Sequence, residues 1–284
     1  MKAPEAVFLT MAVFVGVAFG VHDAVAKLKM EGVEPSSLSL ATLLAGLPLL
    51  VIALPFSGGL RLTLTSGLLY VIAGVINFAL GRTTMYAATT ELSASGASVM
   101  TASSAAFSVV IAAMMGERVG WDVVLGVILI IVAVYLASGW STREATRRGV
   151  ALGLATGLAI AVSVAVIKAG DMLGGSPGLG VILAYLSGTL VLSPRLRRAA
   201  SMFRSNLTPI IVMGLAAAGG QLLRYVALTS LGVDVVTPLQ NLRPVVATMI
   251  LFGLGAGGAK RPRARHWAGA VLAFLGVAMV SGLI

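Results

Sequence analysis

The chain has 284 residues, of which 58% are hydrophobic and only 11% are charged, and its mean hydropathy is +1.01. This composition excludes a soluble domain. The absence of cysteine excludes a disulfide framework, a thiolate nucleophile and a thiolate metal site. The net charge of +10 would indicate nucleic-acid binding in a soluble protein, but the basic residues here lie mostly between apolar runs. They therefore predict orientation in a membrane, with no nucleic-acid partner.

Apolar runs of about 18 residues or more recur along the chain, and each is long enough to cross a hydrocarbon core of about 30 Å as a helix. Backbone polar groups must be satisfied within the bilayer, so the runs are expected to be α-helical. Glycine, proline and charged residues divide the chain into ten predicted spans: Ala3–Leu28, Ser36–Phe56, Leu62–Ala88, Ser93–Met115, Trp121–Gly139, Gly149–Lys168, Pro177–Leu192, Leu207–Thr229, Val233–Leu254 and His266–Ile284.

The first span could also be interpreted as a cleavable signal peptide, because Lys2 and an apolar stretch precede Ala24-Val25-Ala26. However, the sixth span matches it, with Lys168 corresponding to Lys27. A removed signal would have no such counterpart, so we favour a permanent span.

The sequence is duplicated. GVILIIVAVYLASG at 126–139 returns 143 positions later as GAVLAFLGVAMVSG at 269–282. Further identities occur at an offset of 139: Pro55 with Pro194, Tyr86 with Tyr225, Ala88 with Ala227, Thr90 with Thr229, and Leu92 with Leu231. We therefore expect two five-helix repeats, at residues 1–142 and 143–284.

An odd number of spans inverts the second repeat in the bilayer, so equivalent loops should differ in basic residues. Arg61 is the one basic residue between spans two and three, and Arg118 the one between spans four and five. Their counterparts are Arg-rich: Arg195, Arg197, Arg198 and Arg204 in one, and Lys260, Arg261, Arg263 and Arg265 in the other. These basic clusters place both termini outside, in the plasma membrane.

Several motifs resemble the EamA-type ten-helix members of the drug/metabolite transporter superfamily. They are Tyr86-Ala87 before a small-residue helix, Gly116-Glu117-Arg118-Val119, the Gly-rich closing span, Lys27, and Thr237-Pro238-Leu239 through Pro244. The resemblance implies an all-α membrane transporter of two inverted repeats. It also implies cytoplasmic termini, which conflicts with the loop charges.

Polar residues within spans are costly in hydrocarbon and tend to face the bundle interior, so they are the candidate site residues. These are His22, Asp23, Asn77, Arg82, Gln221, Arg224, Gln240, Asn241 and Arg243. Asp23 and Arg82 are expected at similar depth, either as an ion pair or in transport. His22 either relays a proton, together with Asp23, or simply packs. Arg224 either pairs with Asp234, snorkels or binds substrate.

Arg243 is expected near the middle of the ninth span, with no acidic residue at its depth. Gln240 lies one turn earlier, and Pro244 cannot donate to the Gln240 carbonyl, so a kink is predicted. With Asn241, this turn predicts a site for a carboxylate or phosphate. The alternative is an arginine that caps carbonyls of a neighbouring helix.

Tyr86 and Tyr225 are related by the repeat and are predicted either to line two vestibules or to pack. The fourth span is rich in Ser, Ala and Gly, which favours close helix approach. Since it is the repeat partner of the ninth span, the two should cross near the pseudo-twofold axis.

These features predict a secondary transporter that moves a small anionic or zwitterionic metabolite, such as an amino acid, by alternating access. A flippase for lipid headgroups or polyprenyl phosphate is the alternative. A membrane enzyme is disfavoured because the two histidines, His22 and His266, lie in unrelated places. No catalytic residue, metal or cofactor is expected, and the partners are the substrate, the lipid bilayer and, in a homodimer, a second copy.

Overall fold

The computed structural model describes residues 3–30, 32–138, 146–255 and 264–282, and within these ranges every regular element is a helix. The elements are α1 Ala3–Lys29, α2 Pro35–Ala53, η1 Leu54–Phe56, α3 Leu64–Gly74, η2 Val75–Arg82, α4 Thr83–Thr101, α5 Ser103–Met114, α6 Trp121–Ser138, α7 Arg147–Met172, α8 Pro177–Leu192, η4 Ser193–Arg195, α9 Leu196–Ser205, α10 Leu207–Leu228, α11 Val233–Gln240, α12 Arg243–Gly253 and α13 Ala264–Val280.

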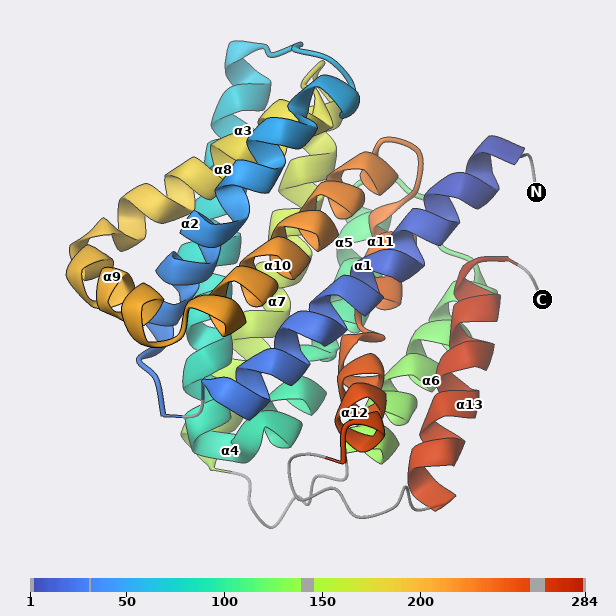
Figure 1. Cartoon of the computed structure of the whole chain (residues 1–284). Coiled ribbons are helices and arrows are strands. Elements are labelled where there is room, and N and C mark those ends of the chain that lie inside the picture. The colour runs from blue at the N-terminus through green and yellow to red at the C-terminus, as the bar shows by residue number, and fades with distance from the viewer. Residues whose placement is uncertain (1–2, 31, 139–145, 256–263, 283–284) are drawn as a thin grey trace.

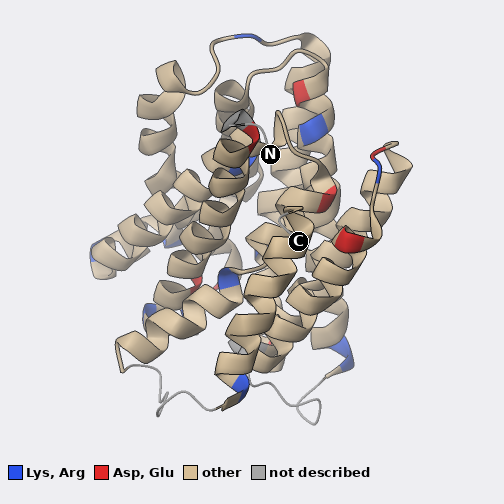
Figure 2. Ribbon diagram, turned by 90° about the vertical axis from the view of Figure 1, so that its right-hand side faces the viewer, with Lys and Arg blue, Asp and Glu red and all other residues tan. Residues whose placement is uncertain are grey.

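Eight segments of the described chain are long and apolar enough to cross a membrane, and Trp121–Leu136 and Ala264–Val280 are shorter apolar helices. Together they correspond to the ten predicted spans, and the predicted all-α membrane fold is confirmed. Charged residues are sparse along the helices (Figure 2). Of the basic residues used to predict orientation, Lys260, Arg261 and Arg263 lie outside the described residues.

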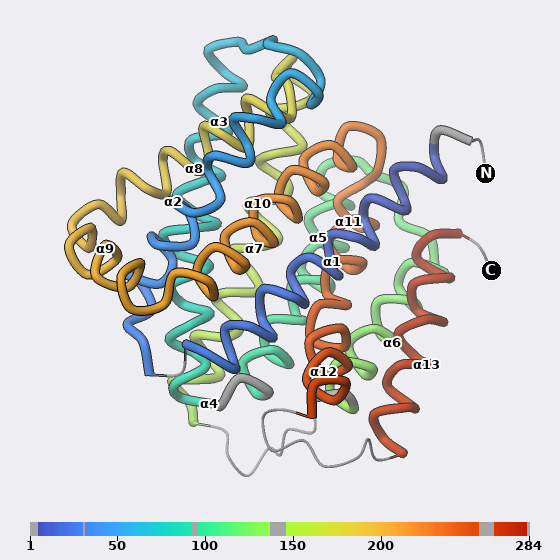
Figure 3. Tube along the Cα trace, viewed as in Figure 1, coloured from blue at the N-terminus to red at the C-terminus, as the bar shows by residue number. Residues whose placement is uncertain are grey.

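Helix packing reflects the duplication. The first helix of each repeat packs against the third span of the other, so that α1 lies along α10 and α7 lies along α3 and α4 (Figures 1 and 3). The fifth helices, α6 and α13, lie side by side at one edge of the bundle. A Cβ placed on Gly126 would lie 2.8 Å from the Gly276 carbonyl, so these glycines allow the two backbones to approach closely.

Two predicted connections are wrong. The connection expected between Ala88 and Ser93 lies within α4, which stays helical because no proline interrupts it. The basic connection after the seventh span contains α9, a short amphipathic helix that buries Ala199 and Met202 while its arginines are exposed. The mean hydropathy of α9 is too low for a predicted span. Its apolar residues nevertheless share one face, and the helix packs on α2 and α10.

Glu34, just before α2, ties α9 to the bundle. Its carboxylate lies 2.9 Å from Arg195 Nε and 2.9 Å from Arg198 Nη1, and it accepts hydrogen bonds from Ser37 and Ser36. The hydrogen bonds from Ser37 and then Arg198 lower the pKa of Glu34 to about 2.

Candidate functional site

The fourth spans of the two repeats are both broken, and the breaks meet at the centre of the molecule. In the first repeat Ala102 separates α4 from α5, and in the second Asn241 and Leu242 separate α11 from α12. Asn241 donates from Nδ2 to Ser104 Oγ at 2.8 Å and to the carbonyl of Ala102 at 3.5 Å. The kink predicted before Pro244 is therefore a complete break, and the fourth and ninth spans cross as expected.

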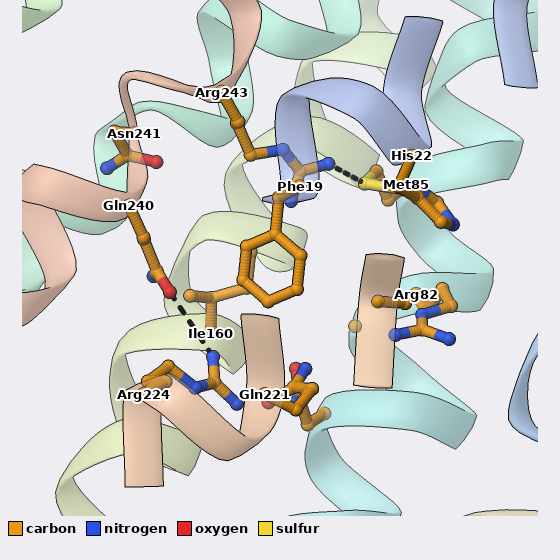
Figure 4. Close-up of a pocket in the computed structure, with 13 residues that line it drawn as sticks. Phe19, His22, Arg82, Met85, Ile160, Gln221, Arg224, Gln240, Asn241 and Arg243 are labelled. Atoms are coloured by element: carbon orange, nitrogen blue, oxygen red, sulfur yellow. Dashed lines mark hydrogen bonds between the residues drawn. The ribbon is translucent and has the colours of Figure 1, made fainter. Parts of the chain in front are cut away.

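A small central cavity of about 40 Å³ lies beside this crossing (Figure 4). Eight of the nine candidate site residues line it: His22, Asn77, Arg82, Gln221, Arg224, Gln240, Asn241 and Arg243. The other lining residues are Phe19, Gly81, Met85, Ile160 and Ala217. The residues come from α1, η2, α4, α7, α10, α11 and α12, so both repeats contribute.

Arg243 has an acidic partner, which contradicts the expectation that none lies at its depth. Its Nε donates to Asp23 Oδ2 at 2.7 Å, and its Nη2 donates to Asp23 Oδ1 at 3.2 Å. Nη2 also lies 2.7 Å from the sulfur of Met85. The expectation was wrong because it placed Arg243 in the membrane as part of one continuous, straight helix. Arg243 instead begins a new helix beyond the break.

The pairing of Asp23 with Arg82 is also wrong. Arg82 donates from Nη1 to Thr42 Oγ1 at 3.1 Å, and its guanidinium lies 4.9 Å from the centre of the Phe78 ring. Arg82 ends the π-helical segment η2, whose wider turns change which residues share a face. Its side chain consequently contacts α2, away from the Asp23 carboxylate.

Arg224 is the least satisfied cation of the cavity. Its side chain is 1% exposed, and it donates from Nη1 to Gln240 Oε1 at 3.3 Å (Figure 4). Its Nε and Nη2 have no hydrogen-bond partner among the described residues. Gln221 Oε1 and Asn77 Nδ2, in the same cavity lining, also lack partners within that part of the chain.

The predicted ion pair of Arg224 with Asp234 does not form, and neither does a snorkelling arrangement. Asp234 lies in the first turn of α11, beside Val233, whose N–H donates to Glu117 Oε2 at 3.0 Å. Arg224 instead lies about one turn before the end of α10, where its side chain is buried and forms part of the cavity lining.

His22 connects the Asp23–Arg243 pair to Tyr86. Its Nδ1 lies 3.0 Å from Asp23 Oδ1, and its Nε2 lies 3.1 Å from the Tyr86 hydroxyl. His22 is 3% exposed. The two residues predicted for proton coupling therefore belong to one hydrogen-bonded chain, although this arrangement serves packing equally well.

A vestibule of about 740 Å³ continues from the central cavity toward the end of α1. Met85, Asn241 and Arg243 line both spaces. Of the two predicted alternatives, Tyr86 lines the vestibule, whereas Tyr225 lines neither space and is packed.

Tyr225 belongs to a packed layer on the other side of the centre. Its ring lies 6.0 Å from that of Tyr70, whose hydroxyl donates to Asp171 Oδ1 at 2.6 Å. The Tyr70–Asp171 pair was not predicted from the sequence. Asp171 is an acidic residue at the end of an apolar helix, close to Lys168, and that position was the available signal.

Comparison with known proteins identifies the family of this chain. No curated protein sequence matches it. The model of the EamA-like transporter family matches residues 7–139 and 147–282. Among 28 matching chains of solved structures, one crystal structure aligns with a TM-score of 0.75 at 15% identity, over 97% of this chain and 99% of that chain, which shows a shared fold. The chain belongs to the EamA-like transporter family and is a multi-pass membrane transporter.

Proposed function

We propose that this protein is a secondary transporter for a small anionic or zwitterionic metabolite, such as an amino acid, and that the anionic group binds Arg224. The observation that carries this proposal is the buried guanidinium of Arg224, a residue of the cavity lining, with two nitrogens unpaired among the described residues. A buried cation without a counter-charge is costly, and an anionic substrate removes that cost.

The charge of the cavity lining supports an anion. Arg82, Arg224 and Arg243 each contribute a cation to the lining. The Asp23 carboxylate binds Arg243 and so offsets the charge of that arginine. A guanidinium binds a carboxylate or phosphate with two parallel hydrogen bonds, and the unpaired Nε and Nη2 of Arg224 suit that geometry. Gln221 and Asn77 supply further polar atoms at the same place.

The size of the two spaces supports a substrate with a compact charged group. The central cavity of about 40 Å³ accepts little more than a carboxylate, whereas the adjoining vestibule of about 740 Å³ holds the rest of a metabolite. Release on the opposite side requires the packed layer of Tyr70 and Tyr225 to open. Transport therefore proceeds by alternating access.

Thermal unfolding of the purified protein tests the anion site. Amino acids, dicarboxylates, sugar phosphates and anionic lipids are added at fixed ionic strength to wild type, to Arg224→Gln and to Arg197→Gln. Arg197 is an exposed arginine of α9 and provides the matched control. We expect at least one soluble anion to raise the Tm of wild type and Arg197→Gln but not of Arg224→Gln.

Two results contradict the proposal: no anion stabilises wild type, or the same anion stabilises Arg224→Gln equally. Stabilisation by anionic lipid alone would replace the metabolite transporter by the flippase.

The basic loops support a cytoplasmic vestibule and external termini in the plasma membrane, because Glu34, in the connection that follows α1, binds Arg195 and Arg198 of the basic connection. A cysteine added at the C-terminus of this cysteine-free chain tests this orientation in cells. We expect an impermeant maleimide to label it from outside, and labelling from the cytoplasm alone would reverse the orientation.

A further inference from the structure

On the side opposite the vestibule, where Tyr70 and Tyr225 pack, a lysine joins two helices. Lys168, in α7, donates from Nζ to the carbonyl of Leu228 at 2.9 Å and to the carbonyl of Leu231 at 2.6 Å. These carbonyls lie at the end of α10 and in the turn that follows it, where no helical N–H satisfies them. An ammonium group at a helix C-terminus is also favoured by the helix dipole. Lys168 thus ties the sixth span to the eighth.

The repeat counterpart of Lys168 is in a different environment. Lys27, in α1, is exposed and lines the vestibule with Tyr86, Thr89 and Thr90. It makes no hydrogen bond or ion pair within the part of the chain that the structure describes. Lys168 is therefore hydrogen-bonded where the helices are packed, and Lys27 has no partner among the described residues at the open vestibule.

The offset of 139 identifies the acceptors that Lys27 lacks here. Leu228 corresponds to Thr89, and Leu231 corresponds to Leu92. Both lie inside the uninterrupted helix α4, so their carbonyls are engaged in the helix. The second repeat differs, because α10 ends at Leu228 and α11 begins at Val233.

We propose that Lys27 and Lys168 alternate in the transport cycle, each stabilising the closed form of one side of the protein. We call the two lysines latches. In the state with a closed vestibule, α4 opens near Thr89, and Lys27 binds the carbonyls of Thr89 and Leu92. Lys168 then releases Leu228 and Leu231, and the opposite side opens. This inference rests on the alternating access of the proposed function, but it does not depend on which substrate is carried.

Cysteine labelling of the detergent-purified protein tests the latches. The chain has no native cysteine, so Thr89→Cys reports on the vestibule and Leu228→Cys, at a position that is 0% exposed, reports on the packed side. Each is combined with Lys27→Met, Lys168→Met or the control Lys29→Met, which removes a neighbouring exposed lysine. The rate of maleimide labelling is measured for each pair.

Loss of Lys168 should raise the labelling rate of Leu228→Cys and lower that of Thr89→Cys, and loss of Lys27 should do the reverse. Loss of a hydrogen bond to a charged group shifts an equilibrium between two states by about tenfold, so we expect the labelling rates to change by about tenfold. Lys168→Arg, which keeps the donors, should restore the wild-type rates, and Lys29→Met should leave them unchanged.

Unchanged rates in both methionine variants would overturn the latches, as would a rise at both cysteines together, which indicates loosening. These outcomes are separate from the fate of the anion site. Reciprocal labelling in a protein that no anion stabilises would support the latches while contradicting the proposed function.

Discussion

The third spans of the two repeats show how a duplicated fold acquires an asymmetric site. At the offset of 139, Met85 corresponds to Arg224 and Arg82 corresponds to Gln221. Met85 accepts a contact from Arg243, whereas Arg224 leaves two nitrogens unpaired among the described residues. The two spans correspond in sequence, but the arginine that we propose as the substrate-binding cation comes from the second repeat. Exchanging residues between equivalent positions therefore tests the account.

The largest effect is expected at Arg243, whose counterpart is Ser104. Giving the second repeat the residue of the first, Arg243→Ser, leaves the partly buried Asp23 carboxylate without its bidentate partner. Breaking such a pair costs about 3–5 kcal/mol. Denaturant unfolding in micelles measures this cost, and Asp23→Asn in the same chain should recover part of it. A single variant as stable as wild type would show that the pair carries no energy.

A smaller effect is expected at the crossing of the fourth spans, where Asn241 stands opposite its own counterpart, Ala102. Asn241→Ala makes the two breaks alike and removes the hydrogen bonds to Ser104. Leaving buried polar atoms unpaired costs about 1–3 kcal/mol. Unfolding of Asn241→Ala, Ser104→Ala and the double variant measures the coupling, and strictly additive losses would mean that the two side chains act independently.

Arg224→Met, which copies the first repeat, should separate stability from binding. Replacing a poorly paired buried cation by an apolar side chain is about neutral for folding or stabilising. Binding of the anion should weaken at least tenfold, because about 1.5–3 kcal/mol is lost with a charged hydrogen bond. Calorimetric titration and thermal unfolding of the same sample measure both. Severe unfolding with unchanged affinity would assign Arg224 to structure.

The smallest effect concerns the ends of the second helices of the repeats, where Glu34 precedes α2 and Ser176 precedes α8. Because folding lowers the pKa of Glu34 to about 2 from its ordinary value of 4.5, its contribution is present above pH 4.5 and is lost as the pH falls toward 2. The group is partly exposed, so Glu34→Gln should cost less than about 1 kcal/mol at pH 7.

Thermal unfolding between pH 3 and 7 checks this contribution. The difference in Tm between wild type and Glu34→Gln should shrink on acidification. A difference that grows would mean that the carboxylate destabilises the fold.

The spans were predictable because the length of an apolar run depends on local composition alone. Likewise, the polar residues of the cavity were predictable because few such residues occur in spans, and eight of the nine candidates line one space. The partners were not predictable. The break after Gln240 and the π-helical turn before Arg82 change which way each arginine points, and neither can be read from hydropathy. Tertiary contact between α1 and α12 then decided the partner of Arg243.

The proposed transport function requires that an anion cross the membrane by way of Arg224. Wild type and Arg224→Met, both shown to be folded, are reconstituted into liposomes, and exchange of the stabilising anion is followed with a radioactive label. We predict that wild type exchanges the label and that Arg224→Met does not. Equal exchange by the two proteins would contradict the account.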